Sequence, residues 1–243
     1  MNGVIAIIQA RMGSTRLPGK VLLDLAGEPM LARVVDRVRR AGRIDDIVVA
    51  TTVSGEDDRI VSLCRERGWR WFRGEVDDVL DRYFRAATEA RAGIVVRITS
   101  DCPLIDPVVV DRVVEEFAKG RESTDYASNI FPLRTFPRGL DTEAIGYGAL
   151  ERSWREEREM RYREHVTQYI LRHPQLFRIR SVTNDTDLSG HRWTVDTPGD
   201  LAFVRAIYDH FGHDRFSTGE ILAFLAAHPE VVEMNRGVVQ KQV

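Results

Sequence analysis

Short apolar runs rich in β-branched residues alternate with amphipathic stretches through the first half of the chain. The apolar runs predict strands at residues 4–9, 46–51, 69–72 and 94–99. The amphipathic stretches predict helices at residues 29–41, 56–67 and 77–92. In the first of these, apolar side chains recur at Leu31, Val34, Val35 and Val38. This is the 3.6-residue period of a helix that buries one face.

The repeated order of strand, helix and strand decides the fold class. Such repeats connect through right-handed crossovers and build a mostly parallel sheet. The strands are nearly continuous in apolar residues, which is typical of a sheet covered on both faces. We therefore expect an α/β fold: a mostly parallel open sheet with helices on both faces.

The pattern loosens in the second half. It predicts helices at residues 107–119, 148–172 and 198–211, and strands at residues 143–147, 177–182 and 192–195. No linker, repeat or low-complexity segment divides the chain. We expect one domain over residues 1–243, with residues 124–182 inserted into it.

Composition and net charge exclude some classes of binding partner. The chain is 43% hydrophobic and 30% charged, as ordinary globular proteins are, and its formal net charge of -2 indicates no general surface for nucleic acid or membrane. Its two cysteines form neither a metal motif nor a disulfide framework. No stretch approaches the roughly 20 apolar residues of a membrane span, and the first apolar run is short and lacks a basic leader. We expect a cytoplasmic protein.

A basic, glycine-rich loop follows the first predicted strand. Residues 10–20 read ARMGSTRLPGK. In an open α/β sheet, ligands bind beyond the carboxyl ends of the strands, where this loop must lie. Gly13 and Gly19 would let backbone N–H groups approach phosphate oxygens, and Arg11, Arg16 and Lys20 add positive charge. The spacing matches neither a P-loop nor a G-x-G-x-x-G fingerprint. The alternative, a solvated basic turn, is weaker because so many phosphate-binding groups follow a buried strand directly.

Two carboxylates follow predicted strands. Asp101 comes after residues 94–99 and Asp196 after residues 192–195, so both belong at the same edge as the loop. Thr197 and Pro198 begin a helix as N-cap and first residue, and Asp200 fits the capping box. We therefore expect Asp200 to be structural. For Asp101 the alternative is a turn-capping role, and for Asp196 a second capping residue.

These motifs resemble those of the cytidylyltransferases that make CMP-sugars. The resemblance rests on the loop at residues 10–20 and recurs, in order, at residues 72–81, 99–104, 137–141 with 163–166, and 195–201. It covers nearly the whole chain, and it is strongest to the branch that contains the spore coat polysaccharide protein SpsF.

The resemblance implies a set of site residues. It implies catalytic roles for Arg11, Lys20, Asp101 and Asp196, the last two as ligands of Mg²⁺, which usually takes one or two carboxylates with substrate phosphates. The implied nucleotide-binding residues are Ala10, Arg11, Met12, Gly13, Ser14, Arg16, Lys20, Asp78 and Ser100. The implied substrate-binding residues are Arg138, Asp141, Glu164 and His165.

Several of these assignments have structural alternatives. The Arg- and Glu-rich stretch around Glu164 and His165 could be a solvated helix with i,i+4 ion pairs. Asp78 stands where a helix N-terminus favours acidic residues, and Asp141 could serve a turn. Asp185 and Asp187 imitate the D-x-D of glycosyltransferases, but their polar surroundings favour a loop.

The expected function is transfer of CMP from CTP to a sugar acid or related sugar with release of pyrophosphate, in surface polysaccharide or glycan biosynthesis. The resemblance also implies a homodimer that forms through residues 124–182. Two alternatives remain: a glycosyltransferase that uses a sugar nucleotide, and a non-catalytic nucleotide-binding module.

Overall fold

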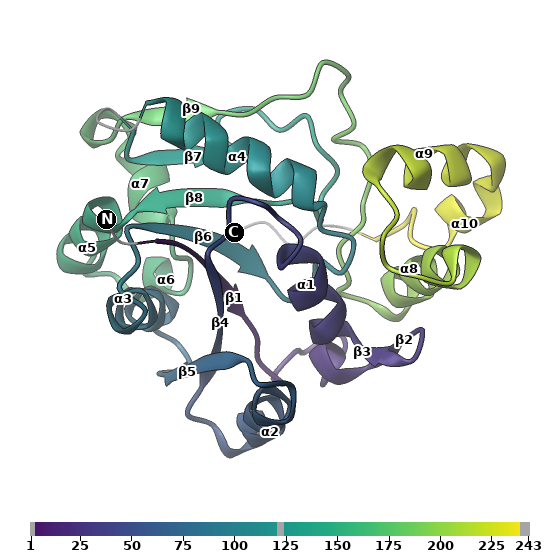
Figure 1. The fold of residues 1–243 in the computed structure, drawn as a ribbon, viewed down its shortest axis with the longest axis horizontal. Helices are drawn as coiled ribbons and strands as arrows, with labels where there is room; N and C mark the ends of the chain where they lie inside the picture. The colour runs from purple at the N-terminus through teal and green to yellow at the C-terminus, as the bar shows by residue number, and fades with distance from the viewer. Residues whose placement is uncertain (1–2, 121–123, 239–243) are drawn as a thin grey trace.

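The computed structural model describes residues 3–120 and 124–238. Within these ranges a seven-stranded sheet forms the centre of the molecule, in the order β5-β4-β1-β6-β8-β7-β9 (Figure 1). The strands are β1 (Val4–Gln9), β4 (Asp46–Thr52), β5 (Arg70–Gly74), β6 (Ile94–Thr99), β7 (Tyr126–Ser128), β8 (Glu143–Gly146) and β9 (Ile179–Ser181). A separate two-stranded ribbon joins β2 (Asp24–Leu25) to β3 (Glu28–Pro29).

Helices lie on both faces of the sheet (Figure 1). The α-helices are α1 (Met30–Val38), α2 (Asp58–Arg67), α3 (Val79–Glu89), α4 (Pro107–Lys119), α5 (Tyr147–Glu156), α6 (Met160–Arg163), α7 (Gln168–Arg172), α8 (Pro198–Phe211), α9 (Thr218–Ala227) and α10 (Pro229–Glu233). Three 3₁₀ turns are η1 (Lys20–Leu22), η2 (Gly55–Asp57) and η3 (Pro174–Leu176). None of the helices described is long and apolar enough to span a bilayer.

Two hydrophobic clusters pack the two faces. Side chains alternate along each strand, so the odd and even positions of β1 enter different clusters. Ala6 and Ile8 pack with α1, α2, α4 and α8. Ile5 and Ile7 pack with α3, α5 and α7. The expected α/β fold with helices on both faces is confirmed.

The sheet changes direction beyond β6. Strands β5, β4, β1 and β6 are mutually parallel, and β8 pairs antiparallel with β6 and β7. The segment at residues 124–182 thus extends the main sheet through β8, β7 and β9, and it covers one face with α5 and α7.

Two predictions of secondary structure are wrong. The helix expected over residues 148–172 is three short helices, α5, α6 and α7, because the backbone is extended at Glu157 and Glu159. The strand expected at residues 192–195 forms only an isolated parallel bridge between Arg138 and Arg192. The remaining strands and helices of the first half lie where expected, within a few residues at their ends.

Candidate active site

A cleft of about 330 Å³ opens at the carboxyl ends of β1 and β6. The two strands are parallel neighbours, so the segments that follow them meet at one edge of the sheet. The cleft is lined by the loop after β1, the turn after β6, the start of α3, the turn after α6 and Asp196, two residues before α8. Of the predicted site residues, those that line it are Ala10, Arg11, Gly13, Ser14, Arg16, Lys20, Ser100, Asp101, Glu164, His165 and Asp196.

The loop is folded around Met12. The Met12 carbonyl accepts hydrogen bonds from the N–H groups of Ser14 at 2.8 Å and Gly19 at 3.0 Å. Gly19 has φ 67°, a left-handed conformation that favours glycine. The Met12 N–H donates to Asp57 at 2.7 Å. Met12 therefore anchors the loop from behind and is not among the residues that line the cleft.

Gly13 leaves the front of the loop open. A Cβ there would meet no atom within 4 Å in the described part of the chain. Arg11 and Arg16 flank this opening, with side chains 45% and 37% exposed. The loop therefore presents backbone and two cations to a ligand in the cleft, as a phosphate cradle requires.

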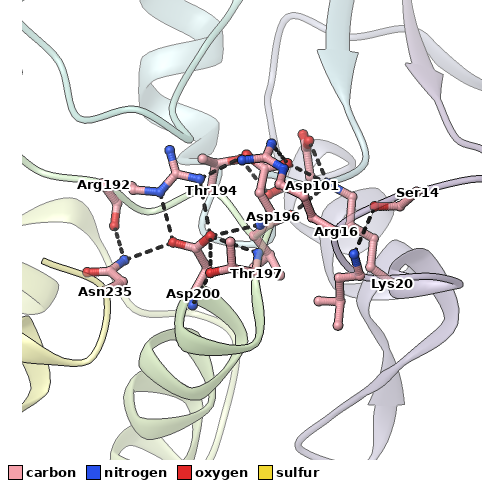
Figure 2. Close-up of polar contacts among 12 residues, drawn as sticks. Ser14, Arg16, Lys20, Asp101, Arg192, Thr194, Asp196, Thr197, Asp200 and Asn235 are labelled. Atoms are coloured by element: carbon pink, nitrogen blue, oxygen red, sulfur yellow. Dashed lines mark hydrogen bonds and ion pairs between the residues drawn. The ribbon is translucent and has the colours of Figure 1, made fainter. Parts of the chain in front are cut away.

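Lys20 lies between the two predicted metal carboxylates (Figure 2). Its Nζ donates to Asp101 at 3.0 Å, to Asp196 at 2.9 Å and to the Val195 carbonyl at 2.7 Å. The Lys20 side chain is only 11% exposed, so all three of its donor positions are used inside the protein. The ammonium thereby links the basic loop to both acidic turns.

The same contacts keep Lys20 and Asp196 ionised. Burial by itself lowers the pKa of Lys20, but the negative charges of Asp101 and Asp196 outweigh it and leave that pKa raised. Burial raises the pKa of Asp196, but the charge of Lys20 and its hydrogen bonds to Lys20 and Arg192 outweigh it and leave that pKa lowered. Both shifts favour the charged pair.

Backbone contacts hold the two acidic turns together. The Asp101 carbonyl accepts from the Val195 N–H at 2.8 Å and from the Thr194 hydroxyl at 3.1 Å. These bonds place Asp196 beside Asp101, although the two are far apart in the sequence. These two bonds, and not a strand at residues 192–195, hold this segment next to Asp101.

A network behind Asp196 fixes its carboxylate (Figure 2). Arg192 donates to Asp196 at 2.9 Å and pairs with both oxygens of Asp200, at 2.8 and 3.1 Å. Asn235 donates to Asp200 at 3.2 Å and to the Arg192 carbonyl at 2.9 Å. Asp200 also completes the capping box with Thr197, which confirms its structural role. Arg192 was missed because no motif marks a side chain that acts through its neighbours.

Both carboxylate oxygens of Asp78 make contacts within the protein. Its carboxylate caps α3 by accepting from the Asp81 N–H at 2.8 Å, and it pairs with Arg163 at 2.8 Å. It does not line the cleft. Both of its oxygens are used, so the structure does not bring this predicted nucleotide-binding residue to the site.

Arg138 and Asp141 also lie outside the cleft. Asp141 accepts two hydrogen bonds from Arg134, at 2.6 and 2.8 Å, in a bidentate pair. Arg138 lines a separate cavity with His191, Arg192 and Trp193. The positive φ of Gly139, 106°, turns the chain so that this segment pairs with residue 192 and not with the loop.

Glu164 and His165 reach the cleft because the expected long helix is broken. The turn after α6 places both at the rim. Glu164 faces Arg11 across the opening at 3.9 Å, and both side chains are about half exposed. Arg163 is instead buried against Asp78 and the Trp154 carbonyl, so it does not belong to a solvated helix face with i,i+4 ion pairs.

Further residues line the cleft that are not among the predicted site residues. They are Gln9, Thr15, Val21, Val79, Arg82 and Thr99. The polar Gln9 ends an otherwise apolar strand, a signal that could have marked it. Arg82 carries no such signal, because its place in α3 fits a solvated helix face equally well.

The carboxylates fit a Mg²⁺ ion. Asp101 uses one oxygen for Lys20, and among residues 3–120 and 124–238 the other oxygen has only the Cys102 thiol near it, at 3.6 Å. No cluster of three acidic, His or Cys ligands exists among the residues described, so a cation here would complete its shell with phosphate oxygens and water, as Mg²⁺ commonly does. Asp196 is less open, since Lys20, Arg16 and Arg192 all contact it.

Known proteins are similar to this chain in sequence and in architecture. A family model described as cytidylyltransferase matches residues 5–233. The spore coat polysaccharide biosynthesis protein SpsF of Bacillus subtilis is 34% identical over 239 residues, 95% of this chain and 97% of SpsF. A 3-deoxy-manno-octulosonate cytidylyltransferase of Anaeromyxobacter dehalogenans is 42% identical over 123 residues, 49% of each chain. The structure of a cytidylyltransferase from Leptospira borgpetersenii superposes with a TM-score of 0.89 at 29% identity, covering 99% of this chain and 98% of that one. With a family model that spans nearly the whole chain and a relative that matches it end to end, this chain belongs to the cytidylyltransferase family.

Proposed function

We propose that the chain transfers CMP from CTP to a sugar acid or related sugar and releases pyrophosphate, with Mg²⁺ as cofactor. The observation that carries this proposal is the meeting of Lys20 with Asp101 and Asp196 at the mouth of the basic loop. The loop offers cations for a triphosphate, and the carboxylates offer ligands for a divalent metal. Similarity to an enzyme named for 3-deoxy-manno-octulosonate supports a sugar acid as acceptor.

The reaction is an in-line displacement at the α-phosphorus. An acceptor hydroxyl oxygen forms the new P–O bond, the bond to the β-phosphate oxygen breaks, and the hydroxyl proton is lost to solvent or buffer. Arg11 and Arg16 hold the triphosphate and stabilise the charge that gathers on pyrophosphate. Lys20 donates to Asp101, Asp196 and the Val195 carbonyl and so keeps the two carboxylates beside the loop. A bound Mg²⁺, held by Asp101 and Asp196, would add Lewis-acid stabilisation of the phosphate oxygens. Most of the rate enhancement then comes from positioning and charge.

Asp196 is held ready for this role by the residues behind it. Arg16, Lys20 and Arg192 surround its carboxylate, and Arg192 is itself fixed by Asp200. A carboxylate that is already oriented needs little reorganisation when a ligand arrives. The acceptor's identity, the homodimer and the cytoplasmic location stay predictions from the sequence.

A pyrophosphate-release screen tests the proposal. CTP, with Mg²⁺ and a panel of sugar acids and amino sugars, should release pyrophosphate with at least one acceptor, and UTP, GTP and ATP should be much poorer. Omission of Mg²⁺ or of the acceptor is the control. Equal turnover of all four nucleotides would exclude the cytidylyl assignment. Transfer from a sugar nucleotide without pyrophosphate would favour the glycosyltransferase alternative.

We expect the acceptor to be read at the rim of the cleft, by Glu164 and His165. His165→Ala should raise the acceptor KM by about 2- to 10-fold, the value of one lost hydrogen bond, while the Kd for CTP stays near that of the wild type. Arg138→Ala is the matched comparison, because Arg138 lies in the neighbouring cavity, and it should leave both constants unchanged. Steady-state kinetics with the acceptor found in the screen measures both. An effect of Arg138→Ala alone would move the acceptor site to that cavity.

A further inference from the structure

A buried carboxylate lies behind the basic loop. Asp57 is 2% exposed and belongs to η2, which follows β4, the strand that pairs with β1. One of its oxygens accepts from the Met12 N–H at 2.7 Å. The other accepts from the Thr52 N–H at 3.1 Å and from the Thr52 hydroxyl. Asp57 is not among the residues that line the cleft, so it can act on a ligand only through the residues it holds.

This carboxylate continues the pairing of β1 with β4 by one step. The Ala10 N–H, just beyond β1, donates to the Ala50 carbonyl at 3.0 Å. In a parallel ladder the next N–H on the same side is two residues further on, at Met12, and its backbone acceptor would be the Thr52 carbonyl. That carbonyl accepts instead from Arg73 Nε at 2.7 Å, and the buried carboxylate takes its place. The side chain therefore fixes the residue at which the loop leaves the sheet.

The position of Met12 decides which backbone groups the loop presents to the cleft. The Met12 carbonyl accepts the N–H groups that turn the loop back, those of Ser14 and Gly19. Other loop N–H groups have no hydrogen-bond partner within residues 3–120 and 124–238 and belong to residues that line the cleft: Gly13, Thr15 and Arg16. Backbone N–H groups that are gathered in one turn form a concave site for an anion. The shape of this site depends on where Met12 is held.

We propose that Asp57 is a positioning residue for the triphosphate: it holds Met12, and through Met12 the basic loop, in the shape that receives the β- and γ-phosphates of CTP. This inference rests on the proposed CTP-dependent function and names a residue that acts without touching the nucleotide. A loop that already has its binding shape loses little conformational freedom when a ligand arrives. Without the carboxylate, part of the binding free energy is spent on ordering the loop.

Two substitutions of Asp57 remove the anchor to different degrees. Asp57→Ala removes both acceptors, so the N–H groups of Met12 and Thr52 lose their partner. Asp57→Asn keeps the shape of the side chain, but its single amide oxygen can serve only one of the two N–H groups and its amino group faces the other. We therefore expect Asp57→Asn to have a smaller effect in the same direction.

Binding of three ligands separates positioning of the loop from general damage to the cleft. Calorimetric Kd values are measured for CTP, pyrophosphate and CMP, with Mg²⁺ and no acceptor. Asp57→Ala should weaken CTP and pyrophosphate by at least about tenfold, as expected for the loss of a hydrogen bond to a carboxylate. Asp57→Asn should weaken both by at least about threefold. CMP, which lacks the β- and γ-phosphates, should bind both variants nearly as it binds the wild type.

Thr52→Val is the matched control, because it disturbs the same network from the strand side. The Thr52 hydroxyl donates to Asp57 and accepts from the Ser54 N–H at 3.1 Å. Val removes both contacts and leaves the bond between Met12 and Asp57 in place. The variant should lower the melting temperature and leave all three Kd values unchanged, so that lost stability alone does not mimic the expected effect.

The outcomes separate this inference from the proposed function. Equal weakening of CMP and CTP by the Asp57 variants would assign Asp57 to the general integrity of the cleft and overturn the inference. Unchanged binding of CTP and pyrophosphate would overturn it too, and so would the failure of both variants to fold, which would assign the carboxylate to the stability of the fold. A wild type that binds neither CTP nor pyrophosphate would instead contradict the proposed function itself.

Discussion

Asp101→Asn is expected to lower kcat by at least about 10²-fold, or about 3 kcal/mol of transition-state stabilisation. The substitution keeps the shape of the side chain but removes the charge that would face Mg²⁺ and Lys20. Asp101 is the better of the two carboxylates to test, because Asp196 is surrounded by Lys20, Arg16 and Arg192. Loss of the Asp196 charge would leave three cations facing an amide and would also disturb the fold.

Pyrophosphate release at saturating CTP measures the effect, with circular dichroism to show that the variant is folded. Asp185→Asn is the control: Asp185 belongs to the D-x-D sequence that imitates glycosyltransferases, is exposed and lies outside the cleft. We expect wild-type kcat for Asp185→Asn. A folded Asp101→Asn protein with near-wild-type kcat would show that Asp101 is structural and would remove the metal assignment.

The nucleotide half of the site follows from the sequence because its signals are local. A buried strand, a loop with two glycines and three cations, and an aspartate after the strand at residues 94–99 are each recognised by short-range rules. The topology of parallel strands then brings Lys20 and Asp101 to one edge of the sheet. Asp200 was recognised as structural for the same reason, because a capping box spans only four residues.

The residues expected to bind the acceptor could not be placed by short-range rules, because tertiary contacts override local helix propensity at residues 148–172. The stretch at residues 148–172 is rich in helix formers, yet Glu157 is extended and pairs with Arg172, 15 residues further along the chain. Arg163 is buried against Asp78, far away in the sequence. Such contacts depend on where other segments lie, which i,i+4 spacing does not reveal.

Arg192 and Arg82 could not be predicted from the sequence for a related reason. Arg192 acts on Asp196 through side-chain contacts that involve Asp200 and Asn235. Arg82 is buried in α3 and lines the cleft, and its Nε and Nη1 have no partner within residues 3–120 and 124–238. Neither a network nor an unsatisfied donor has a sequence motif, so both require the folded structure.

Glu143→Gln is expected to destabilise the protein by about 3–5 kcal/mol, the cost of removing one partner of a buried ion pair. Glu143 is 1% exposed and lies directly across from Arg97 in the antiparallel pairing of β6 with β8. It bonds to Arg97, and it accepts from the Tyr126 hydroxyl at 2.6 Å. One carboxylate thus joins three neighbouring strands at the point where the parallel sheet meets the segment at residues 124–182.

Tyr126→Phe is the matched comparison, because it separates the loss of a hydrogen bond from the loss of the ion pair. That variant loses one hydrogen bond and leaves the ion pair intact, so it should cost only about 1–3 kcal/mol. Urea unfolding followed by circular dichroism measures both free energies. Under the proposed function, CTP should partly restore the stability of Glu143→Gln, because a ligand that binds only the folded state raises its free energy of unfolding. A Glu143→Gln protein no less stable than Tyr126→Phe would show that the ion pair does not hold this junction together and that apolar packing between the strands suffices.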